Sequence, residues 1–406
     1  MTNDDGRPIA DVDFDHHSDS FAEDPWSQLA ELRERCPVAR TDAHGGFWVL
    51  SSYETIKQVA SDDLTFSSAE SVVIPPKKNS SQKSIPIEMD PPHFQAYRRI
   101  LHPMLSPTAV ERLAPTIEFF VHQCIDKVIE KGSCDFVHDL ADPLPAMTTL
   151  LKLGLPLELW EAFSVPLHKV VFLRQDNPLR ANIVEELNFI AQTIKETIAS
   201  RRKDPRDDMI TYLINSEIDG RTLTDHEIEE MVTLIIQGGF DTTGSAISNA
   251  LIRLQQDRDA RRKIIEDPGL LTSAVEEFLR VDPPQFALAR TATSDVTIEG
   301  RNIKKGDRVL MVWASGNRDP IAFEDPDQVV LDRFPNRHMT FGLGAHRCLG
   351  STLARRQIVS ALSGVLRRMP EYEIDFQNAQ RPETIGIAYG MFSLPATFPS
   401  ARRWFR

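Results

Sequence analysis

The chain has 406 residues and a formal net charge of −13, with a sequence pI of about 5.4. Hydrophobic residues make up 41% and charged residues 26%, which is the composition of a globular protein with a large core. This composition excludes collagen-like, disordered and disulfide-scaffold proteins. The negative charge argues against general nucleic-acid binding, which needs a basic surface.

The start of the chain, MTNDDGRPIADVDFDHH, is acidic and polar and lacks the basic and apolar regions of a signal peptide. No apolar run reaches the ~18 residues that a membrane-spanning helix needs. These observations predict a cytoplasmic protein that binds neither membranes nor nucleic acids. We expect residues 1–24 to be a flexible acidic lead, with His16 and His17 in solvent, and residues 25–406 to form a single domain.

Most of the chain after residue 25 has the apolar periodicity of helices. The predicted helices are 25–35, 53–61, 94–105, 108–130, 147–153, 159–173, 184–203 and 351–368. Alternating apolar and polar residues predict short strands at 38–40, 47–49, 296–298, 302–303 and 308–312. The fold class is therefore mainly α with a minor β-sheet region. The segment 67–90 has no periodicity, and a loop of this length is typical of a segment that covers a site.

The longest predicted helix begins with the sequence TDHE at residues 224–227, which fits a capping box. Apolar residues then recur through Leu254, and a helix that ends near Arg258 would be ~50 Å long. Gly238 and Gly239 lie near its middle, where glycine disfavours a helix. The pattern predicts a central helix with a packing notch, a bend or a functional site at these glycines.

The four cysteines form no CxxC pair, and their spacing suits neither a zinc site nor a disulfide framework. They are Cys36, Cys124, Cys134 and Cys348. The first three lie in or beside predicted helices and are expected to be buried, unreactive thiols.

Cys348 lies in the sequence FGLGAHRCLG, residues 341–350. Gly342 and Gly344 allow a tight turn with the backbone close to a bulky group. Cys348 follows at the start of a predicted helix, where the helix dipole is expected to lower the pKa of a thiol. Gly350 leaves room for a flat ligand. A thiolate in this setting suits either a nucleophile or an axial metal ligand, and the loop does not complete a phosphate-binding pattern.

The loop resembles the signature Phe-x-x-Gly-x-x-x-Cys-x-Gly of the cytochrome P-450 superfamily of haem-thiolate monooxygenases. The matching residues are Phe341, Gly344, Cys348 and Gly350. Other motifs of the family occur in the family's order. They are GGFDTT at 238–243, the Glu-x-x-Arg pair in AVEEFLR at 274–280, SGNRDPIAFEDPD at 315–327 and LDRFPNRH at 331–338.

The resemblance covers nearly the whole chain from about Pro25 and is similar to the soluble bacterial class that includes camphor-hydroxylating enzymes. It implies a single large cytochrome P-450 type fold, a triangular prism with a long central helix over the haem. The implied cofactor is haem b, iron protoporphyrin IX, with the thiolate of Cys348 as the iron ligand. Phe341 and Gly350 would lie beside this sulfur.

The resemblance also implies residues that bind the haem propionates. Arg98, Arg290 and His346 match the family's positions for this role. The family commonly has a histidine four residues before the first of these arginines. Here Phe94 stands at that position, and His93 is turned by about 100° around the predicted helix, so His93 is not assigned as a ligand.

Two further sets of residues take roles from the family. Glu277 and Arg280, joined by Arg333, match a buried structural triad that holds the cysteine loop under the haem. Asp241 and Thr242 match a catalytic acid–alcohol pair, in which the threonine hydrogen-bonds the oxygen species and the aspartate helps to relay protons.

The implied function is a bacterial monooxygenase that inserts one atom of dioxygen into a small to medium hydrophobic substrate, such as a terpenoid. The implied substrate-pocket residues are Leu234, Ile235, Gly238, Phe286, Leu288, Met391 and Phe392. The chain is too short to hold a fused reductase, so electron transfer from NAD(P)H through a ferredoxin and a ferredoxin reductase is expected. Arg347, Arg355 and Arg356 could form a basic patch for this partner. A monomer is expected.

Two other readings of the same residues remain open. The first is a haem-thiolate enzyme of other, non-monooxygenase chemistry, such as a peroxygenase, which needs no redox partner. The second is a non-catalytic haem-binding sensor. The pair Asp241 and Thr242 favours the monooxygenase, because neither alternative requires this proton relay.

Overall fold

The structure is a computed structural model that describes residues 11–76 and 83–404. Its α-helices are α1 (Asp19–Glu23), α2 (Pro25–Arg35), α3 (Tyr53–Ser61), α4 (His93–Leu101), α5 (Pro107–Val128), α6 (Pro143–Leu153), α7 (Trp160–Phe172), α8 (Ile183–Lys203), α9 (Met209–Ile214), α10 (Asp225–Gly239), α11 (Asp241–Gln256), α12 (Arg258–Glu266), α13 (Leu271–Val281), α14 (Trp313–Gly316) and α15 (Ser351–Arg368). Its strands are β1 (Val38–Thr41), β2 (Phe47–Leu50), β3 (Phe66–Ser67), β4 (Ser133–Asp135), β5 (Glu217–Ile218), β6 (Arg221–Thr222), β7 (Leu288–Ala292), β8 (Val296–Ile298), β9 (Arg301–Ile303), β10 (Arg308–Met311), β11 (Glu373–Ile374) and β12 (Pro395–Thr397). The prediction of a mainly helical chain with small sheets is confirmed.

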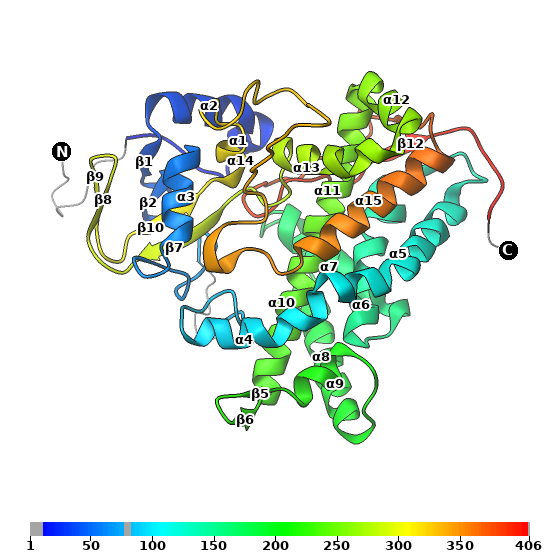
Figure 1. Cartoon of the computed structure of the whole chain (residues 1–406), viewed down its shortest axis with the longest axis horizontal. Helices are drawn as coiled ribbons and strands as arrows, with labels where there is room; N and C mark the ends of the chain where they lie inside the picture. Colours follow the sequence, from blue (N-terminus) through cyan, green and yellow to red (C-terminus); the bar gives the residue numbers. More distant parts are fainter. Residues whose placement is uncertain (1–10, 77–82, 405–406) are drawn as a thin grey trace.

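The long central helix is present but consists of two helices, α10 and α11 (Figure 1). Thr224 caps α10 with the expected capping box, in which the side chains of Thr224 and Glu227 bond each other's backbone N–H. The break is at Phe240, with φ −81° and ψ −79°. The predicted single helix is therefore interrupted next to the two glycines, and α11 begins at Asp241.

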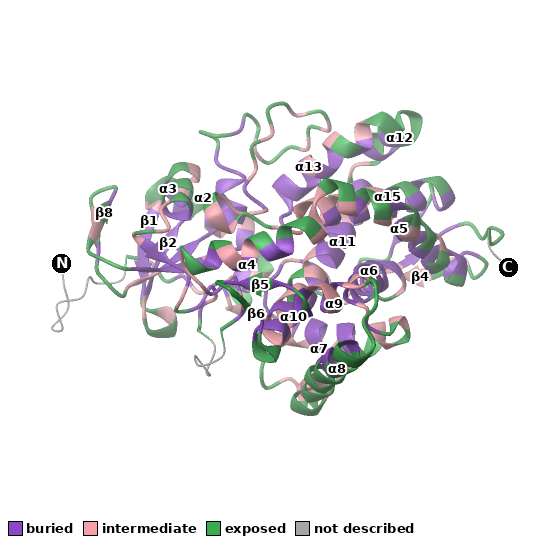
Figure 2. Cartoon of the chain, turned by 60° about the horizontal axis from the view of Figure 1, so that its bottom comes forward, coloured by how far each residue is buried: buried purple, intermediate pink, exposed green. Residues whose placement is uncertain are grey.

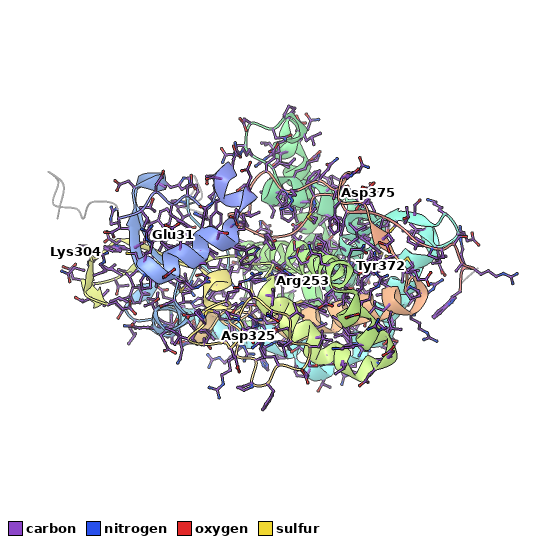
Figure 3. The ribbon with its side chains drawn as sticks, turned by 90° about the horizontal axis from the view of Figure 1, so that it is seen from above. Glu31, Arg253, Lys304, Asp325, Tyr372 and Asp375 are labelled. Carbon is purple, nitrogen blue, oxygen red and sulfur yellow. The ribbon has the colours of Figure 1, made fainter. Side chains whose placement is uncertain are left out.

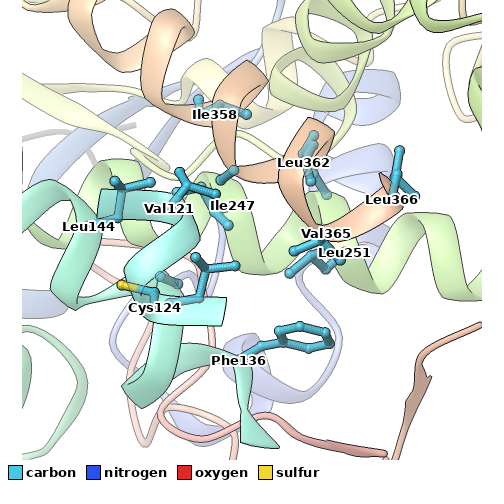
Figure 4. Packing of buried hydrophobic residues seen from close by; sticks show 14 of the residues in the cluster. Val121, Cys124, Phe136, Leu144, Ile247, Leu251, Ile358, Leu362, Val365 and Leu366 are labelled. Atoms are coloured by element: carbon cyan, nitrogen blue, oxygen red, sulfur yellow. The ribbon is translucent and has the colours of Figure 1, made fainter. Parts of the chain in front are cut away.

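The main hydrophobic core lies where α5 and α15 pack on α11 (Figure 4). Val121 and Cys124 of α5 are buried in this cluster with Leu251 of α11 and Leu362 of α15. Gly364 of α15 allows the close approach, because a Cβ atom there would lie 2.5 Å from Cγ1 of Val121. Figure 2 shows the resulting arrangement, with α11 and α13 buried and α8 largely exposed.

A five-stranded sheet stands beside the helices, with strand order β1-β2-β10-β7-β3. The predicted strands at 38–40 and 47–49 pair antiparallel, and β10 then adds parallel to β2. Strand β7 lies between β10 and the edge strand β3, follows α13 in the chain, and was not predicted from the sequence. The hairpin of β8 and β9 projects from the side of the molecule that holds the five-stranded sheet. In Figure 3, Lys304, the residue after β9, lies at the left edge of the molecule, while Arg253 of α11 lies near its centre.

The N-terminal segment differs from the expected flexible lead. Residues 1–10 lie outside the described residues, but Phe14 and Phe21 are buried against the sheet in one cluster with Phe47. His16 is also buried, not solvated, and both His16 and His17 donate a ring N–H to the carbonyl oxygen of Ile74. Burial lowers the pKa of His16 to about 3, so this ring is neutral in the folded protein. Apolar side chains spaced through the acidic segment bring it onto the sheet.

We expect Gly364→Leu to lower the free energy of unfolding by about 1–3 kcal/mol, because the new side chain overpacks the contact with Val121. The matched control is Ser363→Leu at the neighbouring exposed position. Chemical unfolding followed by circular dichroism measures both. Equal stability of the two variants would show that α5 and α15 are not in tight contact at Gly364.

Candidate functional site

The cysteine loop leaves the sheet region and returns to the start of α15. Its first residues are fixed by two hydrogen bonds: Met339 N–H donates to Oδ1 of Asn317 at 2.7 Å, and Thr340 Oγ1 donates to the carbonyl oxygen of Leu279 at 2.6 Å. The loop then turns back on itself, and the N–H of Cys348 donates to the carbonyl oxygen of Phe341 at 2.8 Å. The loop is thus fastened to α13 and to the residue after α14.

The glycines of this loop have different roles. Gly342 and Gly344 have φ of +68° and +66°, which a side chain would disfavour. A Cβ atom at Gly344 would also lie 2.4 Å from the carbonyl oxygen of Ala60, so the bulky neighbour of this glycine is the end of α3. A Cβ atom at Gly350 would stand 3.9 Å from Sγ of Cys348. The loop is therefore anchored on α3 at one point and kept open beside the sulfur at another.

The electrostatics of Cys348 differ from the expectation. Desolvation by the surrounding protein raises the pKa of the Cys348 thiol, although the N–H groups of Gly350 and Ser351 and the charges of Arg98 and Arg355 act to lower it. The helix start and the two cations thus reduce the increase without reversing it. A bound cation such as a metal ion would supply the charge that favours the thiolate.

Three of the predicted cofactor-binding residues converge near the loop. The ring of His346 stacks on Phe94 with centroids 4.0 Å apart, and Nε2 of His346 lies 3.2 Å from Oγ of Ser68. Arg98 donates to the carbonyl oxygen of Arg347 and lies over the Phe94 ring. Burial, together with the charges of Arg290 and Arg98, lowers the pKa of His346 to about 3.

Arg290 is a buried cation that makes no ion pair with a described carboxylate. It is 3% exposed, its Nη1 donates to the carbonyl oxygen of Ala289, and its Nε has no partner among the described residues. Burial lowers the pKa of Arg290 to about 10, against the attraction of Asp63 and Asp90. Nδ1 of His346 is likewise buried and unpaired within the described part of the chain. His93, by contrast, is exposed at the start of α4.

The predicted structural triad is brought together in the protein interior. Arg280 donates two hydrogen bonds of 2.8 Å to the carboxylate of Glu277, and both residues are fully buried. Nε of Arg333 donates to both oxygens of Glu277 at 3.0 and 3.1 Å. Sequence reasoning missed a fourth member, Asn336, whose amide donates to Oε2 at 3.1 Å. Asn336 lies in the LDRFPNRH motif, three residues after Arg333. This position in the motif is the sequence feature from which Asn336 could have been predicted.

Two of the three predicted basic-patch arginines are paired within the chain. Arg355 binds Glu276 through Nε and Nη2 at 2.6 and 2.7 Å and lies over the ring of Phe341. Arg356 binds Glu118 at 2.7 Å. Arg347 is exposed and makes no ion pair within residues 11–76 and 83–404. The basic patch is thus narrower than expected, with Arg347 as its free cation.

Asp241 and Thr242 are the first residues of α11, directly after the break. Oγ1 of Thr242 donates to the carbonyl oxygen of Gly238 at 2.7 Å. Asp241 is 4% exposed, and its Oδ1 lies 2.9 Å from Nδ1 of His168 in α7. His168 and the nearby Asp142 were missed, because no local motif marks them and only the fold brings them to Asp241.

Most predicted pocket residues are half-buried. Ile235 of α10 and Leu349 of the cysteine loop pack on one hydrophobic cluster, and Leu288 and Leu343 pack on another. The remaining predicted residues are Leu234, Gly238, Met391 and Phe392, of which Gly238 is exposed and the others are intermediate. The segment of Met391 and Phe392 lies on α11, because a Cβ atom at the preceding Gly390 would meet Oγ of Ser245 at 2.3 Å.

Phe286 is a correction to the predicted pocket. Its ring is 1% exposed and lies in an aromatic cluster, 5.6 Å from Phe21, 5.4 Å from Trp26 and 5.5 Å from Tyr389 between centroids. The side chain therefore packs under the N-terminal segment and not with the other predicted pocket residues.

Comparisons with known proteins show which family the chain belongs to. The family model described as Cytochrome P450 matches residues 162–397. The cytochrome P450 PksS of polyketide biosynthesis from Bacillus subtilis is 29% identical, over 89% of this chain and 92% of that protein. A steroid C26-monooxygenase of Mycolicibacterium smegmatis is 30% identical, over 91% and 92%. The structure of cytochrome P450 CYP268A2 of Mycobacterium marinum with pseudoionone is 28% identical with a TM-score of 0.88, over 97% and 99%.

The chain belongs to the cytochrome P450 family, and it is a P450 monooxygenase of the kind found in bacteria. Proteins of this family bind haem b through a cysteine thiolate. The residues present fit this group. Cys348 offers a thiol beside an open glycine. Arg290 and His346 offer buried nitrogens without a partner among the described residues, and Arg98 adds a half-buried guanidinium, for two carboxylates.

No helix within the described part of the chain combines the length and the apolar character that a bilayer crossing requires.

We expect Arg280→Ala to give protein with little bound haem. The substitution leaves the buried carboxylate of Glu277 short of a partner, which costs ~3–5 kcal/mol, and loosens the segment before the cysteine loop. Haem content per chain, from absorbance of the purified protein, measures the effect. Arg337→Ala is the matched control because Arg337 is exposed in the same segment. Normal haem content in Arg280→Ala would contradict the structural role.

Proposed function

We propose that this chain inserts one atom of dioxygen into a small to medium hydrophobic organic substrate, with electrons from NAD(P)H delivered by a ferredoxin and its reductase. One observation supports the proposal above all. The chain combines a thiol, Cys348, and the guanidinium groups of Arg98 and Arg290, which suit haem carboxylates, with an acid–alcohol pair at a break in its central helix. A haem-binding sensor has no use for such a pair.

Each residue of the site has a separate task in this proposal. Cys348 would hold the iron, with Arg98, Arg290 and His346 holding the propionates. Haem supplies one-electron and dioxygen chemistry when bound, and a thiolate ligand favours O–O cleavage. The ring of Phe341, fixed by the guanidinium of Arg355 at 4.2 Å, would shield the sulfur from water.

Proton delivery falls to the two residues that start α11. Oγ1 of Thr242 carries a proton that is now donated to the carbonyl oxygen of Gly238, and rotation about its side chain would redirect that proton toward dioxygen. Asp241 would resupply it after first taking up a proton at Oδ2, the carboxylate oxygen that has no hydrogen-bond partner among the described residues. A hydroxyl and a carboxylate on adjacent residues thus form a short relay.

The substrate class follows from the apolar residues around the site. Ile235, Leu288 and Met391 are half-buried and offer no charge, which suits a hydrophobic ligand. The names of the relatives point the same way, since they refer to polyketide biosynthesis, a steroid and pseudoionone. Terpenoids, steroids and polyketides are therefore the first classes to screen.

The first experiment is to reduce the purified holoprotein under carbon monoxide and look for the red-shifted Soret band of a thiolate ligand. A library screen for the low-spin to high-spin shift would then identify substrates. Product formation with NAD(P)H, ferredoxin and reductase supports the proposal. Product formation with hydrogen peroxide alone would instead indicate a peroxygenase.

We expect Thr242→Ala to retain haem and substrate binding but to release a several-fold larger share of its electrons as hydrogen peroxide. The relay loses its hydroxyl, while the fold loses one hydrogen bond to Gly238. Peroxide formed per NAD(P)H consumed is the measurement. Thr242→Ser keeps the hydroxyl and should restore most of the coupling. An unchanged peroxide share in Thr242→Ala would refute the assigned role.

We expect Arg347→Glu to slow electron transfer from an acidic ferredoxin about tenfold at low ionic strength, because an exposed charge at an interface mainly affects association. The difference should shrink as salt screens the charge. Stopped-flow reduction across a salt series measures this rate. Arg381→Glu, another charge reversal outside the cysteine loop, is the control. If Arg347→Glu were reduced as fast as the wild-type protein at every salt concentration, docking at Arg347 would be contradicted.

A further inference from the structure

A buried cluster of two carboxylates and an imidazole stands next to the proposed proton relay. Nδ1 of His168 in α7 lies 2.9 Å from Oδ1 of Asp241 and 3.8 Å from Oδ1 of Asp142. The side chains of all three are less than a tenth exposed. The imidazole is therefore placed between two carboxylates with almost no water around them.

The fold brings these three residues together from separate helices. Asp142 precedes α6, which α11 can approach because residue 244 is a glycine. A Cβ atom at Gly244 would lie 2.8 Å from the carbonyl oxygen of Ala141 and 3.4 Å from Oδ1 of Asp142. The ring of His168 is held by Phe172 and Phe392, with centroids 4.7 and 5.1 Å away. Its position is thus fixed by packing as well as by charge.

The charges favour a protonated imidazole. Desolvation lowers the pKa of His168, but Asp142 and the hydrogen bond to Asp241 outweigh it and raise the pKa to about 9. Desolvation raises the pKa of Asp142 to about 6, against the attraction of His168. His168 is therefore a cation and Asp142 an anion at neutral pH. Protonated Nδ1 must donate to Asp241, so one oxygen of that carboxylate is held, and the other, Oδ2, has no hydrogen-bond partner within residues 11–76 and 83–404.

We propose that His168 is the positioning residue of the proton relay: its imidazolium, held by Asp142, fixes Oδ1 of Asp241 and leaves Oδ2, which is buried without a partner among the described residues, as the oxygen that exchanges protons with Thr242. This inference rests on the proposed monooxygenase function and adds to it a residue from α7. It makes the relay depend on a helix that carries no residue of the acid–alcohol pair.

The sign of the pH dependence follows from the two charges. The pKa of His168 lies above the 6.5 of a free histidine, so the imidazolium is present at neutral pH and is lost as the pH rises through about 9. Asp142 takes up a proton as the pH falls through about 6. The other charged groups that face the cluster are His138, at 3.8 Å from Asp142, and Asp135 beyond it. On α7 itself, Lys169 is paired with Glu186 of α8.

A metal ion is the rival occupant of the same three side chains, whose ligand atoms lie within 4.8 Å of one another. A metal would need the neutral imidazole, because a ligating nitrogen cannot carry a proton. The doubly protonated imidazolium of His168 and a metal-bound imidazole are therefore mutually exclusive states. Measuring the protonation of His168 separates them.

The test is a ¹⁵N-histidine NMR titration of the diamagnetic ferrous carbon monoxide form of the holoprotein. We expect one imidazole to remain protonated at pH 8.5 in the wild type, with a midpoint near 9. His168→Gln should remove this signal, and Asp142→Asn should lower its midpoint by about one unit, a tenfold change in proton affinity. The result should be the same with EDTA and with added Zn²⁺.

The second arm measures hydrogen peroxide formed per NAD(P)H with a surrogate ferredoxin and reductase from pH 6 to pH 9.5. We expect a severalfold larger peroxide share in His168→Gln at pH 7.5, and a wild-type share that rises toward the variant's above pH 9. His226→Gln, the same change at an exposed histidine, is the control.

The outcomes are decisive for this inference separately from the proposed function. A histidine set that is neutral by pH 8, a signal that moves with EDTA or Zn²⁺, or wild-type peroxide values in His168→Gln would overturn it. The proposed function fails on other grounds, if the carbon monoxide form lacks the thiolate band. Should His168→Gln not fold, the wild-type titration and Asp142→Asn still decide the matter.

Discussion

The buried carboxylate of Glu277 is the constraint on which the site depends. It accepts hydrogen bonds from Arg280, Arg333 and Asn336 and from the backbone N–H of Val330. A fully buried charge is stable only when it is paired in this way, so α13 and the segment 324–336 must stay together. The cysteine loop continues from that segment toward the start of α15. The hydrogen bonds of Arg333 and Asn336 to Glu277 therefore fix where the loop begins.

Much of the fold could be predicted because its helices carry their own signals. The bounds 25–35, 53–61 and 351–368 match α2, α3 and α15. Strands β3, β4, β7 and β12 were missed because runs of two to five residues have too little periodicity to separate them from loops. The break at Phe240 was expected only as one of three readings of the two glycines, since its geometry depends on what packs against α10 and α11.

The candidate site likewise contains residues that the sequence predicts and residues that only the fold brings together. Residues inside short motifs, such as Cys348, Glu277 and Thr242, could be found because the motif fixes their spacing. Asp142 and His168 lie far from any motif and meet Asp241 only when three helices pack, so no sequence pattern could place them. Phe286 was misplaced because a position next to a pocket segment does not determine which way its ring points.

The N-terminal segment has a wider effect than its sequence suggests. The rings of His16 and His17 both donate to the carbonyl oxygen of Ile74, which lies in the segment 67–90 that precedes α4. His16 and His17 thus hold the loop 67–90 to the N-terminal segment through two hydrogen bonds. A shortened enzyme that began at α2 would leave that carbonyl without its two donors, so a boundary drawn from helix periodicity alone would remove the contacts that hold this loop to the N-terminal segment.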